Sequence, residues 1–286
     1  MFLTYSTFGF LAWLSVTGLL YFLQDYLLFY PQPLRESEAR FITQGYPSAE
    51  ELTLWTEDGF LLHGWFLKTE GEGRAPALIY FGGNAEEVSW MLSEARRFPG
   101  WSLVLVNYRG YGLSQGKPSE RALLSDGLLI YDSIAKSPEV DPNRIVVFGR
   151  SLGSGLAVYL AKQRKVTAVA LVSPFDSVTS LARRSLPFVP VGLLLKHPFD
   201  SLSLAPSIET PMLTVVAGAD TIIPPKHSRR LFEAWAGPKT FRVVEGADHN
   251  DIQAWEDYWQ GIARFLLETV RESVGGRERL PGVGRL

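Results

Sequence analysis

The chain of 286 residues contains no cysteine, which excludes disulfide bonds, thiolate metal sites and a cysteine nucleophile. Charge of one sign is not in excess either, because 28 Lys and Arg residues face 30 Asp and Glu residues and give a formal net charge of −2. A nucleic-acid partner would require a basic face, so the composition predicts none. Histidine is scarce, and any histidine-based chemistry must use His63, His197, His227 or His249.

A long apolar stretch lies near the N-terminus. Residues 8–23 read FGFLAWLSVTGLLYFL, and of the next seven residues only Gln24 and Asp25 are strongly polar. About 20 apolar residues suffice to cross a bilayer as a helix, so residues 1–30 are predicted to form a single-pass membrane anchor that contacts the membrane through residues 8–30. A buried core helix and a cleaved signal peptide are the alternatives. A signal peptide has a basic start and a small-residue cleavage site, and this stretch has neither. The side of the membrane and the oligomeric state stay open.

The rest of the chain divides by composition. Residues 31–48 are rich in proline and polar residues and predict a linker. Residues 49–274 alternate apolar strand-like runs with helical patterns, which favours one α/β domain with a mainly parallel sheet flanked by helices. Residues 275–286 are expected to be a loose tail. The strand-like runs are ELTLWT, FLLHGWFL, ALIYF, SLVLVNY, RIVVFG, TAVALVS, MLTVVAG and TFRVVEG, and the expected helices lie near 85–98, 120–136, 152–164, 225–236 and 250–273.

One apolar segment breaks this alternation. About residues 177–206 contain Pro187, Pro190 and Pro198 and no strand pattern, and we interpret them as a short helical lid. Glu57, Asp58 and Gly59 separate the first two strand-like runs, and Asp-Gly is a strong signal for a hairpin turn. The predicted architecture is therefore a hairpin followed by a parallel α/β sheet, with a lid inserted late in the chain.

Two stretches fit the pattern G-x-S-x-G, in which a serine sits on a sharp turn between a strand and a helix. One is GLSQG from Gly112, and the other is GRSLG from Gly149. The first follows its strand through a long glycine-rich connection, so Ser114 is predicted to be a loop serine. The second comes directly after RIVVFG, and helical spacing begins at once after it. This context favours Ser151 as a nucleophile over an ordinary serine N-cap.

The base and the acid should follow the serine in the order acid, then histidine. His249 comes just after the last predicted strand, in a loop at the carboxyl edge of the sheet, where ligands bind in such folds. Asp220 directly follows MLTVVAGA, where its carboxylate would orient the imidazole and stabilise its protonated form. The rival acids are Asp176, Asp200, Asp248 and Asp251. Of the other histidines, His63 is expected to be an ordinary strand residue, His197 a structural or exposed lid residue and His227 a polar surface residue.

A tetrahedral intermediate of acyl transfer also needs two preorganised N–H donors. One should be the N–H group of Leu152, the residue after the nucleophile, and the other should come from the loop after the third strand. That loop reads GGNAEE. We assign the second donor to the N–H group of Asn84, with Gly83 as the alternative. A glycine turn with an Asn helix cap is the plainer interpretation of the same letters.

These pieces together resemble the α/β-hydrolase superfamily, and within it the single-anchor bud-emergence branch and the related alpha/beta-hydrolase-domain-containing proteins. The resemblance spans nearly the whole chain and implies a serine-hydrolase triad of Ser151, Asp220 and His249, with GLSQG as a structural loop. One departure is that the family usually has His-Gly where this chain has Gly82-Gly83. The matching pieces are YFGGNAEEV, NYRGYGLSQGKPSE, GRSLGSGLA, SPFDSV, LLLKHPFDSL, AGADTIIPPKHS, the His249 region and LLFYPQP.

The predicted function is that of a serine hydrolase, carboxylesterase- or thioesterase-like, that cleaves an acyl ester or thioester and needs no metal or cofactor. The apolar lid and anchor favour a lipid-like or acylated small-molecule substrate near a membrane. The resemblance adds thioesters, because related proteins remove fatty acyl groups from cysteines. A serine peptidase or amidase of the same fold and a non-catalytic membrane-anchored scaffold are the alternatives. Arg150 and Lys196 are expected to be solvated surface charges rather than ligands for an anionic substrate group.

Overall fold

The structure, a computed structural model, describes residues 2–69, 71 and 73–275. Within these residues, eight strands form one sheet in the order β1-β2-β4-β3-β5-β6-β7-β8. β2 pairs antiparallel with β1 and with β4, and the neighbouring pairs from β4 to β8 are parallel. The predicted hairpin and mainly parallel sheet are thus confirmed. The strands are β1 (Ala49–Trp55), β2 (Leu61–Leu67), β3 (Ala75–Phe81), β4 (Ser102–Val106), β5 (Val140–Arg150), β6 (Ala168–Val172), β7 (Met212–Ala217) and β8 (Lys239–Val244).

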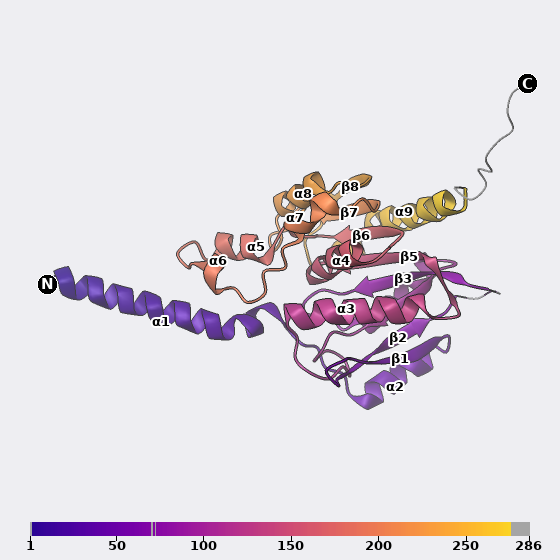
Figure 1. The fold of residues 1–286 in the computed structure, drawn as a ribbon, viewed down its shortest axis with the longest axis horizontal. Coiled ribbons are helices and arrows are strands. Elements are labelled where there is room, and N and C mark those ends of the chain that lie inside the picture. Colours follow the sequence, from indigo (N-terminus) through magenta and orange to yellow (C-terminus); the bar gives the residue numbers. More distant parts are fainter. Residues whose placement is uncertain (1, 70, 72, 276–286) are drawn as a thin grey trace, which may run out of the picture.

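Helices cover both faces of the sheet (Figure 1). Successive strand residues point to opposite faces, so the apolar runs of the central strands supply two cores. Ile79 and Phe81 of β3 pack on one face, and Leu78 and Tyr80 pack on the other. The first face is covered by α3 (Glu120–Ala135), α4 (Leu152–Gln163) and α8 (Pro225–Ala234), and the second by α2 (Glu36–Gly45), the 3₁₀ helix η1 (Val88–Arg97) and α9 (Glu256–Gly275), which follows the short η3 (Ile252–Ala254).

The N-terminal helix α1 (Phe2–Leu28) projects away from this body (Figure 1). Its segment Thr7–Leu28 is long and apolar enough to cross a membrane, with a mean hydropathy of 1.4. Only 11% of this apolar stretch is buried, so α1 is not a core helix. The end of the stretch 1–30 nevertheless packs on the body, where Gln24 and Phe29 are buried, and a domain boundary at residue 30 stays a prediction.

The expected lid leaves the sheet after β6 and returns to it at β7. It forms α5 (Val178–Ser185), α6 (Val191–Leu194), α7 (Ser201–Leu204) and the short η2 (Ala205–Ser207). α5 and α6 lie on the side of the molecule from which α1 projects (Figure 1). Hydrogen bonds join the two segments, because Trp13 Nε1 donates to the carbonyl oxygen of Phe188 at 2.8 Å and Gln24 Nε2 donates to that of Leu194 at 3.2 Å.

The stretch 31–48, predicted as a linker, contains the helix α2 and packs on the domain. Pro33 forms a β-bridge with Gly112, and Ala39 of α2 is buried. The carboxylate of Glu38 accepts from the backbone N–H of Arg35 at 2.7 Å and caps the helix start. The prolines at the start of the stretch indicate a linker, but the amphipathic residues after them form a helix. The predicted tail 275–286 lies outside the described residues except for Gly275, the last residue of α9.

Candidate active site

β5 runs directly into α4, and Ser151 makes the turn between them. Its φ of +50° lies in the left-handed region, which costs a non-glycine residue about 1–3 kcal/mol and is typical of functional turns. Glycines let the strand and the helix approach closely. A Cβ atom on Gly153 would lie 2.1 Å from the carbonyl oxygen of Phe81, and one on Gly149 would lie 2.4 Å from the carbonyl oxygen of Gly153. The predicted sharp turn at GRSLG is therefore present.

His249 and Asp220 lie beside Ser151, and all three are buried. Nε2 of His249 is 3.0 Å from Oγ of Ser151, and Nδ1 is 2.7 Å from Oδ2 of Asp220. The other carboxylate oxygen of Asp220 accepts from the backbone N–H groups of Ile222 and Ile223 at 3.0 and 2.7 Å. An ionised carboxylate can only accept. The proton of a neutral imidazole therefore sits on Nδ1, and Nε2 is left to accept from the serine hydroxyl.

Asp176, a rival acid, belongs to a second pair. Its Oδ1 is 2.9 Å from Nδ1 of His227, and its Oδ2 is 2.6 Å from a guanidinium nitrogen of Arg230. His227 is only 3% exposed, so its prediction as a surface residue is wrong. The first turn of α8 packs against the segment that follows β6 and buries the imidazole there. Asp176 is thereby kept away from His249.

The remaining rival acids and histidines make other contacts. None of their contacts involves Ser151 within the part of the chain that the structure describes. They are Asp200, which caps α7, Asp248 and Asp251, which accept backbone N–H groups in their own loop, His63, whose Nε2 is 3.5 Å from Glu51, and His197, whose Nε2 is 3.0 Å from Asp25. His63 and His197 are both buried, as structural residues can be.

The loop after β3 lies beside the turn that Ser151 makes between β5 and α4. A Cβ atom on Gly83 would be 3.8 Å from Cβ of Ser151. Among the described residues, the backbone N–H groups of Leu152 and Asn84 have no hydrogen-bond partner, so both can donate to a ligand oxygen. The N–H group of Gly83 instead donates to Oε2 of Glu86 at 2.9 Å. Of the two expected donors in this loop, the geometry therefore favours Asn84.

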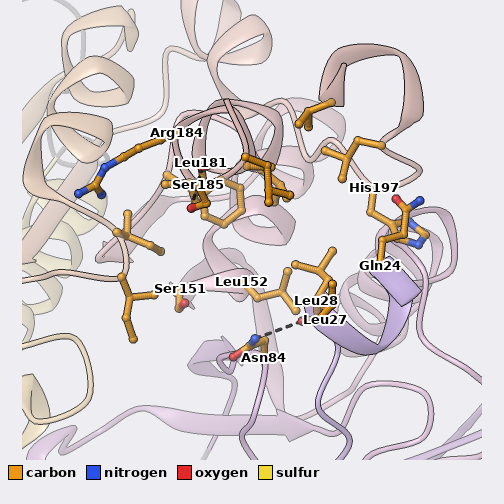
Figure 2. Close-up of a pocket in the computed structure, with 18 of the residues that line it drawn as sticks. Gln24, Leu27, Leu28, Asn84, Ser151, Leu152, Leu181, Arg184, Ser185 and His197 are labelled. Carbon is orange, nitrogen blue, oxygen red and sulfur yellow. Dashed lines mark hydrogen bonds between the residues drawn. The ribbon is translucent and has the colours of Figure 1, made fainter. Parts of the chain in front are cut away.

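The end of α1 holds Asn84 in place. Asn84 Nδ2 donates to the carbonyl oxygen of Leu28 at 3.1 Å (Figure 2). The carbonyl oxygen of Asn84 accepts from the backbone N–H of Tyr30 at 3.1 Å and from the hydroxyl of Tyr111 at 2.6 Å. Burial raises the pKa of Tyr111, so its hydroxyl keeps the donated proton. No local pattern of residues predicts this contact, because Leu28 and Asn84 are 56 positions apart.

A buried ion pair that sequence reasoning missed lies beneath the same loop. A guanidinium nitrogen of Arg150 is 2.9 Å from Oε2 of Glu86, and another donates to the carbonyl oxygen of His249 at 3.0 Å. Oε1 of Glu86 also accepts from the hydroxyl of Tyr80 at 2.5 Å and from Nε1 of Trp90 at 2.6 Å. Burial acts to lower the pKa of Arg150, but the charge of Glu86 and the neighbouring hydroxyls of Tyr80 and Tyr258 together outweigh it and raise the pKa. Arg150 is therefore not the solvated surface charge that was expected.

This ion pair also bears on the departure at Gly82. A Cβ atom at that position would lie 3.0 Å from Oε1 of Glu86, so the carboxylate fills the space beside the glycine. Both partners of the pair stand in motifs already singled out, Arg150 in GRSLG and Glu86 in GGNAEE. Arg150 stands next to Ser151, and Glu86 stands two positions after Asn84. Charges this close to predicted site residues were the signal that could have revealed the ion pair.

A cavity of about 840 Å³ adjoins Ser151. One face of α1, the loop after β3, the turn at Ser151 and the lid line it (Figure 2), and the loops after β7 and β8 complete the lining. Most of the lining side chains from α1 and the lid are apolar. Across the described residues, no cluster of three or more His, Asp or Glu side chains is arranged to hold a metal ion.

The competing stretch GLSQG is structural. Oγ of Ser114 accepts from the backbone N–H of His63 at 2.8 Å and donates to the carbonyl oxygen of Asn107 at 2.9 Å. The serine is buried, and these bonds join the loop after β4 to β2. The interpretation of Ser114 as a loop serine is therefore confirmed by its contacts.

A known family and several relatives match large parts of the chain. The model of the dienelactone hydrolase family matches residues 114–253, a span that contains Ser151, Asp220 and His249. The "uncharacterized protein Rv2307c" of Mycobacterium tuberculosis is 37% identical over 227 residues, which cover 78% of this chain and 81% of that protein. The chain belongs to the dienelactone hydrolase family of α/β hydrolases. As a member of this family it is a hydrolase, and the resemblance predicted from its motifs is confirmed.

Other members of the superfamily match over similar lengths. The "alpha/beta hydrolase domain-containing protein WAV2" of Arabidopsis thaliana is 29% identical over 240 residues, covering 76% of this chain and 78% of that one. The "uncharacterized membrane protein YNL320W" of Saccharomyces cerevisiae is 31% identical over 230 residues, covering 77% and 80%. Among solved structures, an acetyl xylan esterase from Paenibacillus sp. R4 has a TM-score of 0.62 at 20% identity, covering 86% of this chain and 98% of that one. This likeness shows that the α/β-hydrolase fold is shared.

Proposed function

We propose that this α/β hydrolase is a serine hydrolase that cleaves an acyl ester or thioester through an acyl-enzyme. The observation that carries the proposal is the unbroken line of contacts from Ser151 Oγ through both ring nitrogens of His249 to Asp220. A serine hydroxyl is a poor nucleophile until a base takes its proton. The buried imidazole is placed for that role, with Asp220 holding the ring in the required orientation.

The reaction would run in two halves. Ser151 Oγ attacks the acyl carbonyl carbon while Nε2 of His249 accepts the hydroxyl proton. The tetrahedral intermediate then expels the alcohol or thiol, which takes that proton from the imidazolium. In the second half a water molecule gives a proton to Nε2 and attacks the acyl-enzyme, and the free acid leaves as Oγ regains the proton.

The oxyanion of both intermediates would lie between the backbone N–H groups of Leu152 and Asn84. Each such donor contributes about 10²–10³ to the rate in enzymes of this kind. Their lack of other hydrogen-bond partners in the described residues supports this role. These steps use side chains and backbone groups of the chain alone and require no metal or cofactor.

A lipid-like or acylated substrate near a membrane is favoured by two observations. The cavity beside Ser151 is lined mainly by apolar side chains, including one face of α1. α1 also carries the apolar segment Thr7–Leu28, which is long enough to span a bilayer. A relative of the chain is described as a membrane protein. We therefore propose that residues 8–30 anchor the chain in a membrane.

A panel of esters, thioesters and amides of graded acyl length tests this function. The purified full-length chain should hydrolyse esters or thioesters, and Ser151→Ala should lose that turnover. Hydrolysis of amides alone would identify a peptidase or amidase of the same fold. Absence of turnover on every class, with correctly folded protein, would support the non-catalytic scaffold instead.

A further inference from the structure

The residues of α1 that line the cavity recur every three or four positions along the helix. Side chains three and four positions apart lie on one face of a helix. On this face Thr17 and Gln24 are buried and Leu20 and Leu28 are half-buried, whereas Tyr21 and Leu27 are 38% and 53% exposed. Its neighbours on the opposite face, Leu19 and Phe22, are 58% and 72% exposed. The lining residues of α1 are Thr17, Leu20, Tyr21, Gln24, Leu27 and Leu28.

One end of this face is fixed at the active site. The carbonyl oxygen of Leu28 accepts from Asn84 Nδ2, and the backbone N–H of Asn84 is the proposed oxyanion donor. Thr17, at the other end of the face, is eleven residues earlier, which corresponds to about 16 Å along a helix. Because an extended alkyl chain is a zigzag that advances about 1.25 Å per C–C bond, a chain of roughly 14 carbons has this length.

The lid supplies the facing wall and is tied to α1. The side-chain carbonyl of Gln24 accepts from the backbone N–H of Lys196 at 2.7 Å, while its amide nitrogen donates to the carbonyl oxygen of Leu194. Asp25 lies 3.0 Å from Nε2 of His197. These contacts give Gln24 and Asp25 partners in the lid. Most of the remaining lid lining is apolar and includes Leu181, Leu186, Val189 and Val191.

We propose that this face of α1 binds the acyl chain of the substrate, so that the enzyme selects long acyl groups. The acyl carbonyl lies at Ser151, and the chain runs between α1 and the lid toward Thr17. The proposal rests on the proposed acyl-hydrolase function and names its substrate class. It gives α1 a role in specificity that a simple membrane anchor would not have.

The outer edge of the lid fits the arrival of such a chain from a lipid layer. Residues 185–195 carry no charge, and Phe188 and Leu193 are 84% and 87% exposed. The same edge touches α1, where Trp13 donates to the carbonyl oxygen of Phe188. An acyl chain that leaves a bilayer beside α1 would therefore meet apolar side chains from the start.

Tryptophan substitutions on α1 test the proposal through the length of chain that each one blocks. The full-length chain is assayed with p-nitrophenyl acetate, octanoate, dodecanoate and palmitate, and kcat/KM is expressed relative to acetate. In the wild type this ratio should rise with chain length, by up to about fourfold per methylene. Leu20→Trp, within the cavity, should lower the ratio at least about tenfold for dodecanoate and palmitate. Thr17→Trp, at the far end, should do so for palmitate but not octanoate.

The matched control is Leu19→Trp, which adds the same side chain one position away on the exposed face. It should leave the whole series as in the wild type. The same chain-length profile in Thr17→Trp, Leu20→Trp and Leu19→Trp would overturn the proposal.

A binding measurement separates this result from the question of catalysis. Ser151→Ala in nanodiscs is titrated with a fluorescent 16-carbon fatty acid, which needs no turnover to bind. Adding Leu20→Trp should weaken binding at least about tenfold, and adding Leu19→Trp should not. Equal binding in both would reject the acyl-binding face even if the enzyme hydrolyses esters. Selective weakening without any turnover would keep the binding face and reject the serine-hydrolase function.

Discussion

Asn84 Nδ2 donates a hydrogen bond to the carbonyl oxygen of Leu28 at 3.1 Å, and this bond joins the last turn of α1 to the loop that carries a proposed oxyanion donor. The position of the apolar N-terminal helix is thereby coupled to the geometry of the active site. Membrane anchoring and catalysis would then share structural elements, because one helix supplies both the bilayer segment and a wall of the substrate cavity.

Replacing the Asn84 side chain should weaken this coupling. Asn84→Ala keeps the backbone N–H but loses the bond to Leu28. A typical hydrogen bond contributes about 1 kcal/mol, so we expect kcat to fall roughly fivefold as the loop loosens. Ester turnover by the full-length chain measures this. Gln32→Ala, which removes an exposed bond to the carbonyl oxygen of Tyr30, is the control and should leave kcat unchanged. Equal rates for Asn84→Ala and the wild type would contradict the coupling.

The two buried aspartate–histidine pairs should respond differently to substitution. Asp220→Asn disturbs the orientation and tautomer of His249 and should lower kcat by about 10⁴. Asp176→Asn weakens the pair with His227 and Arg230, so it should lower the melting temperature while turnover below that temperature persists. Steady-state kinetics and thermal unfolding of both variants decide the matter. If Asp176→Asn lost as much turnover as Asp220→Asn, the assignment of Asp220 as the acid that orients His249 would be wrong.

Ser114→Ala should affect stability but not catalysis. The substitution leaves the buried backbone N–H of His63 and the carbonyl oxygen of Asn107 without their partner. Leaving buried groups unpaired costs about 1–3 kcal/mol each. We expect a lower free energy of unfolding in urea and wild-type ester turnover. A loss of activity without a loss of stability would instead give Ser114 a role in the reaction.

The ion pair of Arg150 with Glu86 should contribute far more than a comparable pair at the surface. Both side chains of this pair are about one-tenth exposed, so Arg150→Met leaves a carboxylate buried without its partner. Such a change typically costs about 3–5 kcal/mol. Arg164 and Asp132 form an ion pair, with two hydrogen bonds, that is about one-third exposed.

Arg164→Met is therefore the matched control and should cost less than about 1 kcal/mol. Unfolding curves of the two variants in urea give both values. A similar loss of stability in the two would show that burial of the first pair has no special effect. Because Arg150 also donates to the carbonyl oxygen of His249, we expect lower turnover only in Arg150→Met.

The sequence allowed the fold and the three central residues to be predicted because their signals are local. Ser151 and Asp220 closely follow apolar runs, and His249 lies in the loop after the last one. The carboxyl ends of parallel strands meet at one edge of the sheet. The tight turn of the loop after β3 could be predicted in the same way from its glycines. These predictions needed only the order of strands and helices along the chain.

The contacts that tie the site together could not be predicted, because they join distant segments. Arg150 and Glu86 are 64 positions apart, and Gln24 and Leu194 are 170 apart. Their pairing depends on how the loop after β3 and the lid pack in three dimensions. For the same reason His227 was expected at the surface, although the packing of α8 on the segment after β6 buries it.

The central claim is that Ser151 is the nucleophile, and labelling by a fluorophosphonate tests it most directly. The full-length chain is treated with the probe, digested, and examined by mass spectrometry. We predict one modified peptide with the label on Ser151, no labelling of Ser151→Ala, and much slower labelling of His249→Ala. Modification of Ser114 or another serine in its place, or undiminished labelling of Ser151→Ala, would contradict the account.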